Sequence, residues 1–171
     1  MSLRVSFNEA EVNRATDGRF IEKTGTSPEL ALTPTIEFQE SPLNEADVSD
    51  FTGGDCNHLA QRLHERLGWE PVIVTTDGHG WTHVGVRSPD GYVLDAEGIS
   101  DGSHIVNSDT YAGMFSDEEL EASDGDVFLA EMPPAEREFI AAEYEMHTDR
   151  GRVERVAEQL IAWVDALGIR R

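Results

Sequence analysis

Residues 56–98 constrain the fold more than any other part of the chain, because a helical period gives way there to strand-like runs. In CNHLAQRLHERL, apolar residues recur three and four positions apart, at positions 56, 59, 60, 63 and 67. This spacing is typical of a helix with one buried face, and Gly68 supplies a stop signal. The runs PVIVTT, WTHVGVR and YVLDAEG that follow are rich in β-formers and are separated by turn residues. We therefore expect a helix followed by a three-stranded antiparallel meander.

The flanking sequence extends this core on both sides. Its patterns predict a strand over 33–39, short helices over 44–51 and 116–122, a fourth strand over 126–131 and two helices over 134–147 and 152–168. Residues 1–32 are polar, show no sustained period and predict a mobile N-terminal arm. The expected architecture is a single α+β domain over 33–171, with a helix packed on a small antiparallel sheet. Its catalytic-like core covers 51–98, and its helical C-terminal part covers 134–168.

The segment SPDG (88–91) allows the hairpin register to be worked out. It suits a turn with Gly91 in the left-handed conformation, which makes the numbers of facing residues sum to 180. Gly85 then faces Asp95, and His83 faces Glu97. His83 and Asp95 become diagonal neighbours on one face of the sheet, about 7 Å apart at the backbone. Gly85 has no side chain to block their approach.

The hairpin has a second, apolar face. We expect this face to pack against the C-terminal helices and the Cys56 helix to pack on the His83 face. The apolar face carries Val84, Val86, Leu94 and Ala96, and the helix would pack through Leu59, Ala60, Leu63 and Leu67.

Cys56 is the only cysteine in the chain, which excludes an intramolecular disulfide. A helix start stabilises a thiolate, which is the attacking form of cysteine. Such a nucleophile needs a histidine as its acid/base partner and a third group that orients the histidine. His83 and Asp95 are the candidates for these two roles, and Glu97 is the rival orienting carboxylate. Structural interpretations stay open, because a lone cysteine is often buried filler and an aspartate before glycine is often a turn former.

The stretches GGDCNHLAQRLHERLG and THVGVRSPDGYVLDAEG resemble the papain-like superfamily of thiol hydrolases. They are most similar to its NlpC/P60, transglutaminase-like and papain-fold toxin branches. The resemblance implies a papain-like core with Cys56 as nucleophile, His83 as acid/base and Asp95 as the orienting residue. It also implies acyl transfer on a peptide or protein amide, by hydrolysis, deamidation or cross-linking. The segment RATDGRFIEKTGTSPEL resembles N-terminal stretches of hypothetical proteins from actinobacteria and their phages.

Residues around the cysteine are candidates for substrate binding. We expect Trp81, Gly54 and Asn57 to line the site. The backbone N–H of Cys56 is the expected oxyanion donor, with the Asn57 and Gln39 side chains as alternatives.

Other polar residues near the cysteine have different expected roles. Asp55 is expected to cap the helix with its carboxylate, and His147 is expected on the surface. Cys56, His79, His83 and Asp95 could together ligate zinc, but they lack the close spacing of a recognised zinc motif. We therefore expect no metal and no cofactor.

The net charge of −21 narrows the choice of partners. So acidic a chain is not expected to bind nucleic acid or an anionic membrane directly. Residues 101–171 carry −11 of this charge, which is a solvated surface in the simplest interpretation. The rival interpretation is a non-catalytic acidic interaction or inhibitor protein, phage-derived, that mimics nucleic acid or blocks a basic partner through 101–171. A third interpretation is an inactive papain-like domain that serves only for binding.

Two features of the sequence bear on where the protein is located in the cell. The segment MSLRVSFNEAEV has no apolar stretch typical of a secretory signal, and no window of the sequence is apolar enough to span a bilayer. We expect a cytoplasmic protein.

Overall fold

The computed structural model describes residues 36–76, 80–107, 111, 113–122, 127–147 and 149–169. The chain divides into two units, Met1–Leu32 and Thr33–Arg171. All of the described residues belong to the second unit. The mobile arm predicted over 1–32 therefore lies outside the described residues.

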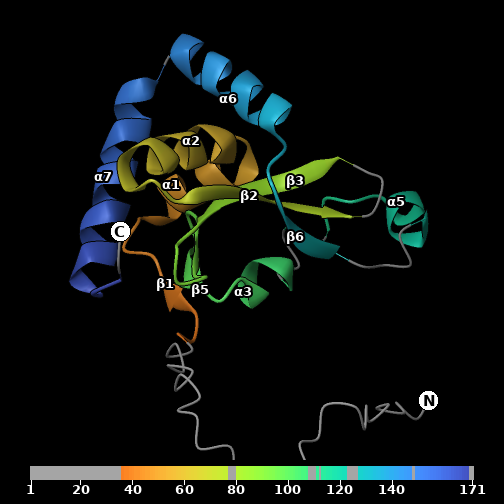
Figure 1. Cartoon of the computed structure of the whole chain (residues 1–171), viewed down its shortest axis with the longest axis horizontal. Coiled ribbons are helices and arrows are strands. Elements are labelled where there is room, and N and C mark those ends of the chain that lie inside the picture. The colour runs from red at the N-terminus through yellow and green to blue at the C-terminus, as the bar shows by residue number, and fades with distance from the viewer. Residues whose placement is uncertain are drawn as a thin grey trace, which may run out of the picture. The chain divides into compact units, whose positions relative to one another are not determined.

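The second unit has an α+β fold, as the sequence predicts (Figure 1). Short strands and helices come first, and two longer helices close the chain. In chain order the elements are β1 (Gln39–Glu40), α1 (Glu45–Gly53), α2 (Cys56–Leu67), β2 (Glu70–Thr76), β3 (Trp81–Arg87), β4 (Val93–Leu94), β5 (Gly98–Ser100), α3 (Ser103–Val106), α5 (Asp117–Ala122), β6 (Val127–Glu131), α6 (Pro134–Met146) and α7 (Arg150–Ala166).

The strands form one antiparallel sheet of six strands in the order β1-β5-β4-β3-β2-β6. Strands β2, β3 and β4 are consecutive neighbours, which confirms the predicted meander. The predicted register is also confirmed, because Arg87 pairs with Val93 across the hairpin. Gly91 has φ of 90°, a value that favours glycine, and the Ser88 N–H donates to the Tyr92 carbonyl at 2.7 Å. The SPDG turn thus sets the relation between β3 and β4.

The strand predicted over 92–98 is shorter than expected, because the chain turns back after Leu94. The Asp95 carboxylate accepts the backbone N–H groups of Glu97 at 2.9 Å and Gly98 at 3.0 Å. The Asp95 N–H donates to the Gly98 carbonyl at 3.0 Å. Aspartate side chains commonly close turns in this way. The chain therefore reverses into β5, and the predicted pairing of Glu97 opposite His83 is wrong.

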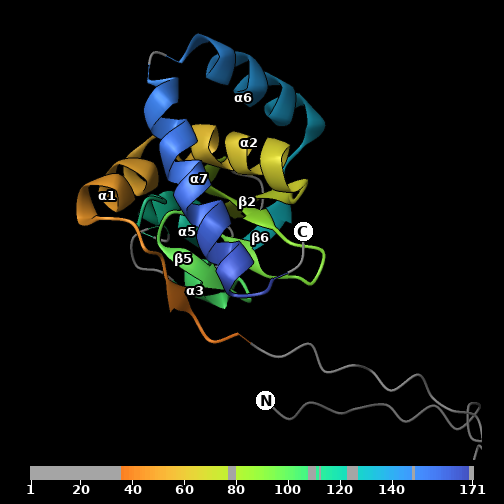
Figure 2. The same cartoon turned by 90° about the vertical axis from the view of Figure 1, so that its left-hand side faces the viewer.

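Helix α2 packs on one face of the sheet and also contacts α6 and α7, as Figures 1 and 2 show. The helix is expected to lie on the His83 face, but its apolar residues share a core with the opposite face. That core contains Leu59, Ala60, Leu63, Leu67, Val84, Val86, Leu94 and Ala96 together with residues of α6 and α7. The prediction of the packing face is therefore wrong. An apolar helix stripe packs better on valines and a leucine than on a face that carries histidine and aspartate.

The His83 face is covered by a smaller cluster instead. Val74, which pairs directly with His83, packs there with Tyr111, Ile105 and Phe115. The last three of these residues lie between β5 and α5, in a part of the sequence without a regular apolar period. Because both faces of the sheet are covered, Pro71 to Thr76 of β2 are buried without interruption.

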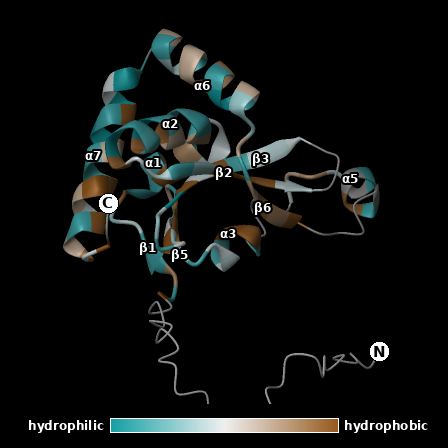
Figure 3. Ribbon diagram, in the orientation of Figure 1, coloured by the Kyte–Doolittle hydropathy of each residue, from teal (hydrophilic) through white to brown (hydrophobic). Residues whose placement is uncertain are grey.

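Side-chain burial holds the start of α2 firmly in place. Leu59 is 2% exposed and Leu63 is 1% exposed, and each contributes about 1.5–3 kcal/mol by leaving water. In Figure 3 hydrophilic and hydrophobic residues alternate along α6 and α7, as expected for helices with one buried side. The position of Cys56 is thus determined by packing along the whole helix.

Among the described residues, none of the helices has the length and apolar character needed to cross a bilayer.

Candidate functional site

His83 and Asp95 form a buried hydrogen-bonded pair. The Nε2 atom of His83 lies 2.9 Å from Oδ2 of Asp95, and their side chains are 1% and 2% exposed. The two residues come from β3 and from the turn after β4, so the SPDG register brings them together. A Cβ added to Gly85 would meet the Leu94 carbonyl at 3.0 Å and the Asp95 Cβ at 3.7 Å. The absence of a side chain at Gly85 therefore gives the close approach that the pair needs.

Both oxygens of Asp95 are engaged. Oδ1 accepts the two backbone N–H groups that close the turn after β4. Oδ2 accepts from the His83 ring and from the Tyr111 hydroxyl, which lies 3.1 Å away. A carboxylate with this many donors has little freedom to move. Asp95 therefore closes the turn and holds the imidazole at the same time.

Tyr111 is a site residue that the sequence does not reveal. Its ring stacks on the His83 ring, with centroids 3.8 Å apart and planes inclined by 16°. Burial, followed by the nearby carboxylates of Asp95 and Glu97, raises the pKa of Tyr111, which keeps its hydroxyl protonated as a donor. The sequence signal that could have pointed to Tyr111 is weak: it is a single tyrosine within a polar region. Tyr111 therefore contacts the face of the His83 ring, whereas Asp95 contacts its edge at Nε2.

Cys56 is the first residue of α2, and it is 6% exposed. Burial disfavours a charged His83, but the hydrogen bond to Asp95 and the adjacent Cys56 thiol outweigh burial and raise the pKa of His83 to about 9. Nε2 is held by Asp95, and Nδ1 makes no hydrogen bond within the described part of the chain. Nδ1 is therefore the ring nitrogen left for the thiol. The structure thus pairs His83 with Asp95, and Cys56, at the start of α2, contributes to the raised pKa of the imidazole.

Asp55 does not act as the expected helix cap. Its carboxylate makes no hydrogen bond to the backbone of α2. Oδ1 instead lies 3.4 Å from Nδ1 of His58 and 3.4 Å from Nε2 of His147. His147, which is expected on the surface, is partly buried there, because its side chain is 16% exposed and its ring centroid lies 4.1 Å from that of His58. The Asp55 carboxylate therefore faces the two imidazoles and not the backbone N–H groups of α2.

The predicted substrate-binding residues occupy different surroundings. Gly54 lines an open cavity of about 270 Å³ together with Ser49, Asp50, Gly53 and Asp55, next to the start of α2. Trp81 is half-buried against the main core. The Asn57 side-chain oxygen accepts the His58 N–H at 2.9 Å, so it is turned onto its own helix. Of the three, Gly54 is the one that lines a described cavity beside the start of α2.

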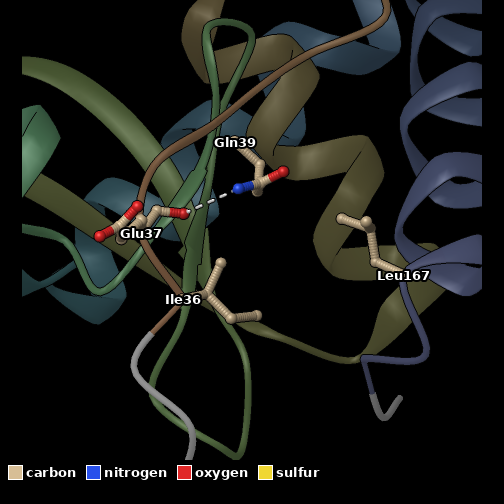
Figure 4. Close-up of a pocket in the computed structure, with 4 residues that line it drawn as sticks. All are labelled: Ile36, Glu37, Gln39 and Leu167. Atoms are coloured by element: carbon tan, nitrogen blue, oxygen red, sulfur yellow. Dashed lines mark hydrogen bonds between the residues drawn. The ribbon is translucent and has the colours of Figure 1, made fainter.

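Gln39 is placed away from the thiol. It lines a separate cavity with Ile36, Glu37 and Leu167, shown in Figure 4. Its side-chain nitrogen donates to the Glu37 carbonyl at 3.4 Å, the bond drawn there. The backbone N–H of Cys56 therefore stays the better oxyanion candidate.

Glu97 does not replace Asp95 as the partner of His83. Its carboxylate lies 3.6 Å from Nε2 of His104. Burial, followed by the charge of Asp95, raises the pKa of Glu97. The zinc alternative includes His79, which lies outside the described residues, while Asp95 is already occupied by four donors.

Comparison with known proteins finds no family model, no curated protein and no solved structure that matches this chain.

Proposed function

We propose that the protein is a cysteine-dependent acyl-transfer enzyme acting on an amide, a peptidase, deamidase or amidase with a Cys56–His83–Asp95 triad on a papain-like core. One observation carries the proposal. His83 is held by Asp95 through Nε2, its Nδ1 has no hydrogen bond within the described part of the chain, and Cys56 contributes to the raised pKa of the imidazole. Burying an ionisable histidine and aspartate costs free energy, and a buried pair with a strongly shifted pKa is more common at functional sites. The proposal includes action in the cytoplasm.

The proposed reaction follows the chemistry of the three groups. A cationic imidazole stabilises the thiolate, which attacks the carbonyl carbon of the amide. The backbone N–H of Cys56 and the field of the α2 N-terminus stabilise the negative oxygen that forms. His83 gives its proton to the leaving nitrogen as the C–N bond breaks, and a thioester with Cys56 remains. Water, or an amine in cross-linking, then attacks the thioester while His83 takes up its proton.

The acyl-enzyme provides a direct test. The chain is incubated with a pool of peptides that presents all twenty side chains next to an amide, with hydroxylamine and EDTA present. Hydroxylamine converts the thioester to a hydroxamate, which mass spectrometry detects. We expect hydroxamates from the native chain and from the control His104→Gln, and none from Cys56→Ala. A native chain that forms no more hydroxamate than Cys56→Ala contradicts the proposal.

A second candidate function is docking on a basic partner without catalysis. Helix α6 exposes two large apolar side chains, Phe139 at 59% and Met146 at 75%. Exposed glutamates, Glu138 and Glu145, flank them. The helix therefore presents apolar and acidic groups side by side, which suits a partner surface with apolar and basic groups. Binding to a basic protein that weakens with salt and does not change in Cys56→Ala would support this function over the first.

A further inference from the structure

A second cluster of polar side chains lies beside the triad and has no part in the proposed reaction. Asp55 and His58 come from the start of α2, and His147 ends α6. One ligand atom from each residue, a carboxylate oxygen or an imidazole nitrogen, lies within 4.8 Å of the other two. Carboxylate and imidazole are common ligands of zinc-class metals in proteins.

Two of the three distances between ligand atoms are close to those around a bound metal. Asp55 Oδ1 is 3.4 Å from each imidazole nitrogen. Two ligands roughly 2.0–2.1 Å from a tetrahedral zinc are about 3.3 Å apart, whereas neighbouring ligands of an octahedral ion at that distance are about 2.9 Å apart. The spacing therefore favours tetrahedral over octahedral coordination.

His58 supplies an independent reason to expect a ligand. Its side chain is only 12% exposed, and neither of its ring nitrogens makes a hydrogen bond within the described part of the chain. Buried polar groups are normally satisfied, because an unsatisfied one costs about 1–3 kcal/mol. The Asp55 carboxylate is also turned away from the backbone of α2, which it would otherwise cap. Both departures are explained if the two side chains serve a shared cation.

We propose that Asp55, His58 and His147 bind a zinc-class divalent cation with tetrahedral geometry, leaving the fourth position for water or another ligand. The ion would join the start of α2 to the end of α6. This site is separate from the acyl-transfer chemistry and does not depend on it, because it uses neither the thiol nor His83.

Binding requires one rearrangement of protons. The Asp149 N–H donates to Nδ1 of His147 at 3.2 Å, so Nε2 carries the proton of the neutral ring. Metal at Nε2 moves that proton to Nδ1 and breaks the bond from Asp149, at a cost of about 1 kcal/mol. A single metal–imidazole bond outweighs this cost, since structural zinc sites bind with about 10–16 kcal/mol in total.

Titration of the full chain with Co²⁺ and with Zn²⁺ tests the site. Tetrahedral Co²⁺ gives intense visible absorption, whereas octahedral Co²⁺ gives weak bands. We expect one tetrahedral Co²⁺ per chain, displaced by Zn²⁺, and a higher Tm when Zn²⁺ is bound. In His58→Gln and in His147→Gln, zinc affinity measured by competition with a coloured chelator should fall more than about 100-fold, beyond the roughly 10–100-fold effect of outer-shell partners.

Matched variants identify the ligands. His104→Gln makes the same substitution outside the cluster and should bind as the native chain does. Cys56→Ala should also bind normally, so that failure of this proposal and failure of the proposed triad are distinguishable. Circular dichroism checks that each variant is folded. The proposal is overturned if the native chain binds no metal, if the bound Co²⁺ is octahedral, if both glutamine variants keep native affinity, or if Cys56→Ala abolishes binding.

Discussion

Two buried aspartates, Asp47 and Asp95, have similar surroundings but different kinds of partner. Each is 3% exposed. Asp47 on α1 accepts from Arg152 at 2.8 Å, Arg155 at 3.0 Å and Asn44 at 2.8 Å. Asp95 accepts from His83, Tyr111 and two backbone N–H groups. Both carboxylates are well satisfied, so burial and hydrogen bonding alone do not distinguish a structural carboxylate from a functional one.

The difference lies in whether the partners can change their protonation. Arginine stays charged at any pH a protein tolerates, so the Asp47 cluster can only join α1 to α7. Histidine can gain and lose a proton, and Asp95 and Cys56 outweigh burial to raise the pKa of His83 to about 9. Under the proposed function, His83 gains and loses a proton in the Asp95 cluster, whereas the arginines of the Asp47 cluster offer no such step. The comparison predicts that changes at Asp95 alter reactivity and that changes at Asp47 alter stability.

The largest expected effect comes from Asp95→Asn. The amide keeps the shape of the carboxylate but no longer stabilises the imidazolium or selects its tautomer. We expect the rate of hydroxamate formation to fall about 10²- to 10⁴-fold, by the precedent of such carboxylates in triads. The rate is measured with saturating peptide pool, and circular dichroism confirms the fold. If Asp95→Asn lowers stability but keeps the native rate, Asp95 is only a turn former.

Asp47→Asn should have the opposite profile. We expect the free energy of unfolding to fall by about 1–2 kcal/mol, less than a fully buried ion pair would lose, because Arg152 is 29% exposed and Arg155 is 49% exposed. Urea unfolding measures the change, and Asp50→Asn, whose carboxylate is 50% exposed, is the control with a smaller loss. An altered rate of hydroxamate formation in Asp47→Asn would break the distinction between the clusters.

Acid should weaken the Asp47 cluster in a defined range of pH. The hydrogen bond from Arg155, opposed by burial and reinforced by Arg152 and Asn44, lowers the pKa of Asp47 from 3.8 to about 2. A carboxyl with a lowered folded-state pKa contributes stability that is complete above its unfolded pKa and is lost below it. The contribution of Asp47 should therefore persist down to about pH 4 and disappear between about pH 4 and pH 2. Urea unfolding of the native chain and of Asp47→Asn should converge over that range.

Tyr111→Phe should give the smallest effect. Phenylalanine keeps the ring that stacks on His83 and removes the hydroxyl that donates to Asp95. The loss of one hydrogen bond is worth about 0.5–1.5 kcal/mol, which corresponds to a rate roughly 2- to 10-fold lower. Tyr111→Leu, which also removes the stacking, should lower the rate further. Equal rates in both variants would show that the stacked ring does not position His83.

The sequence predicts the elements well where local patterns decide them. The apolar period of α2 and the turn residues of SPDG determine the helix and the β3–β4 register, and these give the His83–Asp95 contact. Local signals fail where distant residues compete. Asp55 is a good cap by type, yet His147, ninety-two positions later, attracts its carboxylate. The same holds for Asp47, whose arginines lie on α7.

Sequence periodicity also could not predict which elements cover each face of the sheet. Alternation along β3 correctly separates His83 from Val84, but it does not say which face a helix covers. Coverage of the His83 face depends on Tyr111, which lies in a polar region without a regular period. Burial between residues that are distant in the sequence is decided by the whole tertiary structure and not by any local stretch of sequence.

The most direct test of the triad is the rate at which iodoacetamide alkylates Cys56 at pH 6.5, with EDTA present, in the native chain and in His83→Gln. The thiol is similarly buried in both proteins, so the difference in alkylation rate measures the effect of the imidazole on Cys56. We expect the native chain to react at least about ten times faster than His83→Gln, because a neighbouring imidazolium favours the thiolate, and His104→Gln to react as the native chain does. Equal rates in the native chain and His83→Gln would contradict the proposed function.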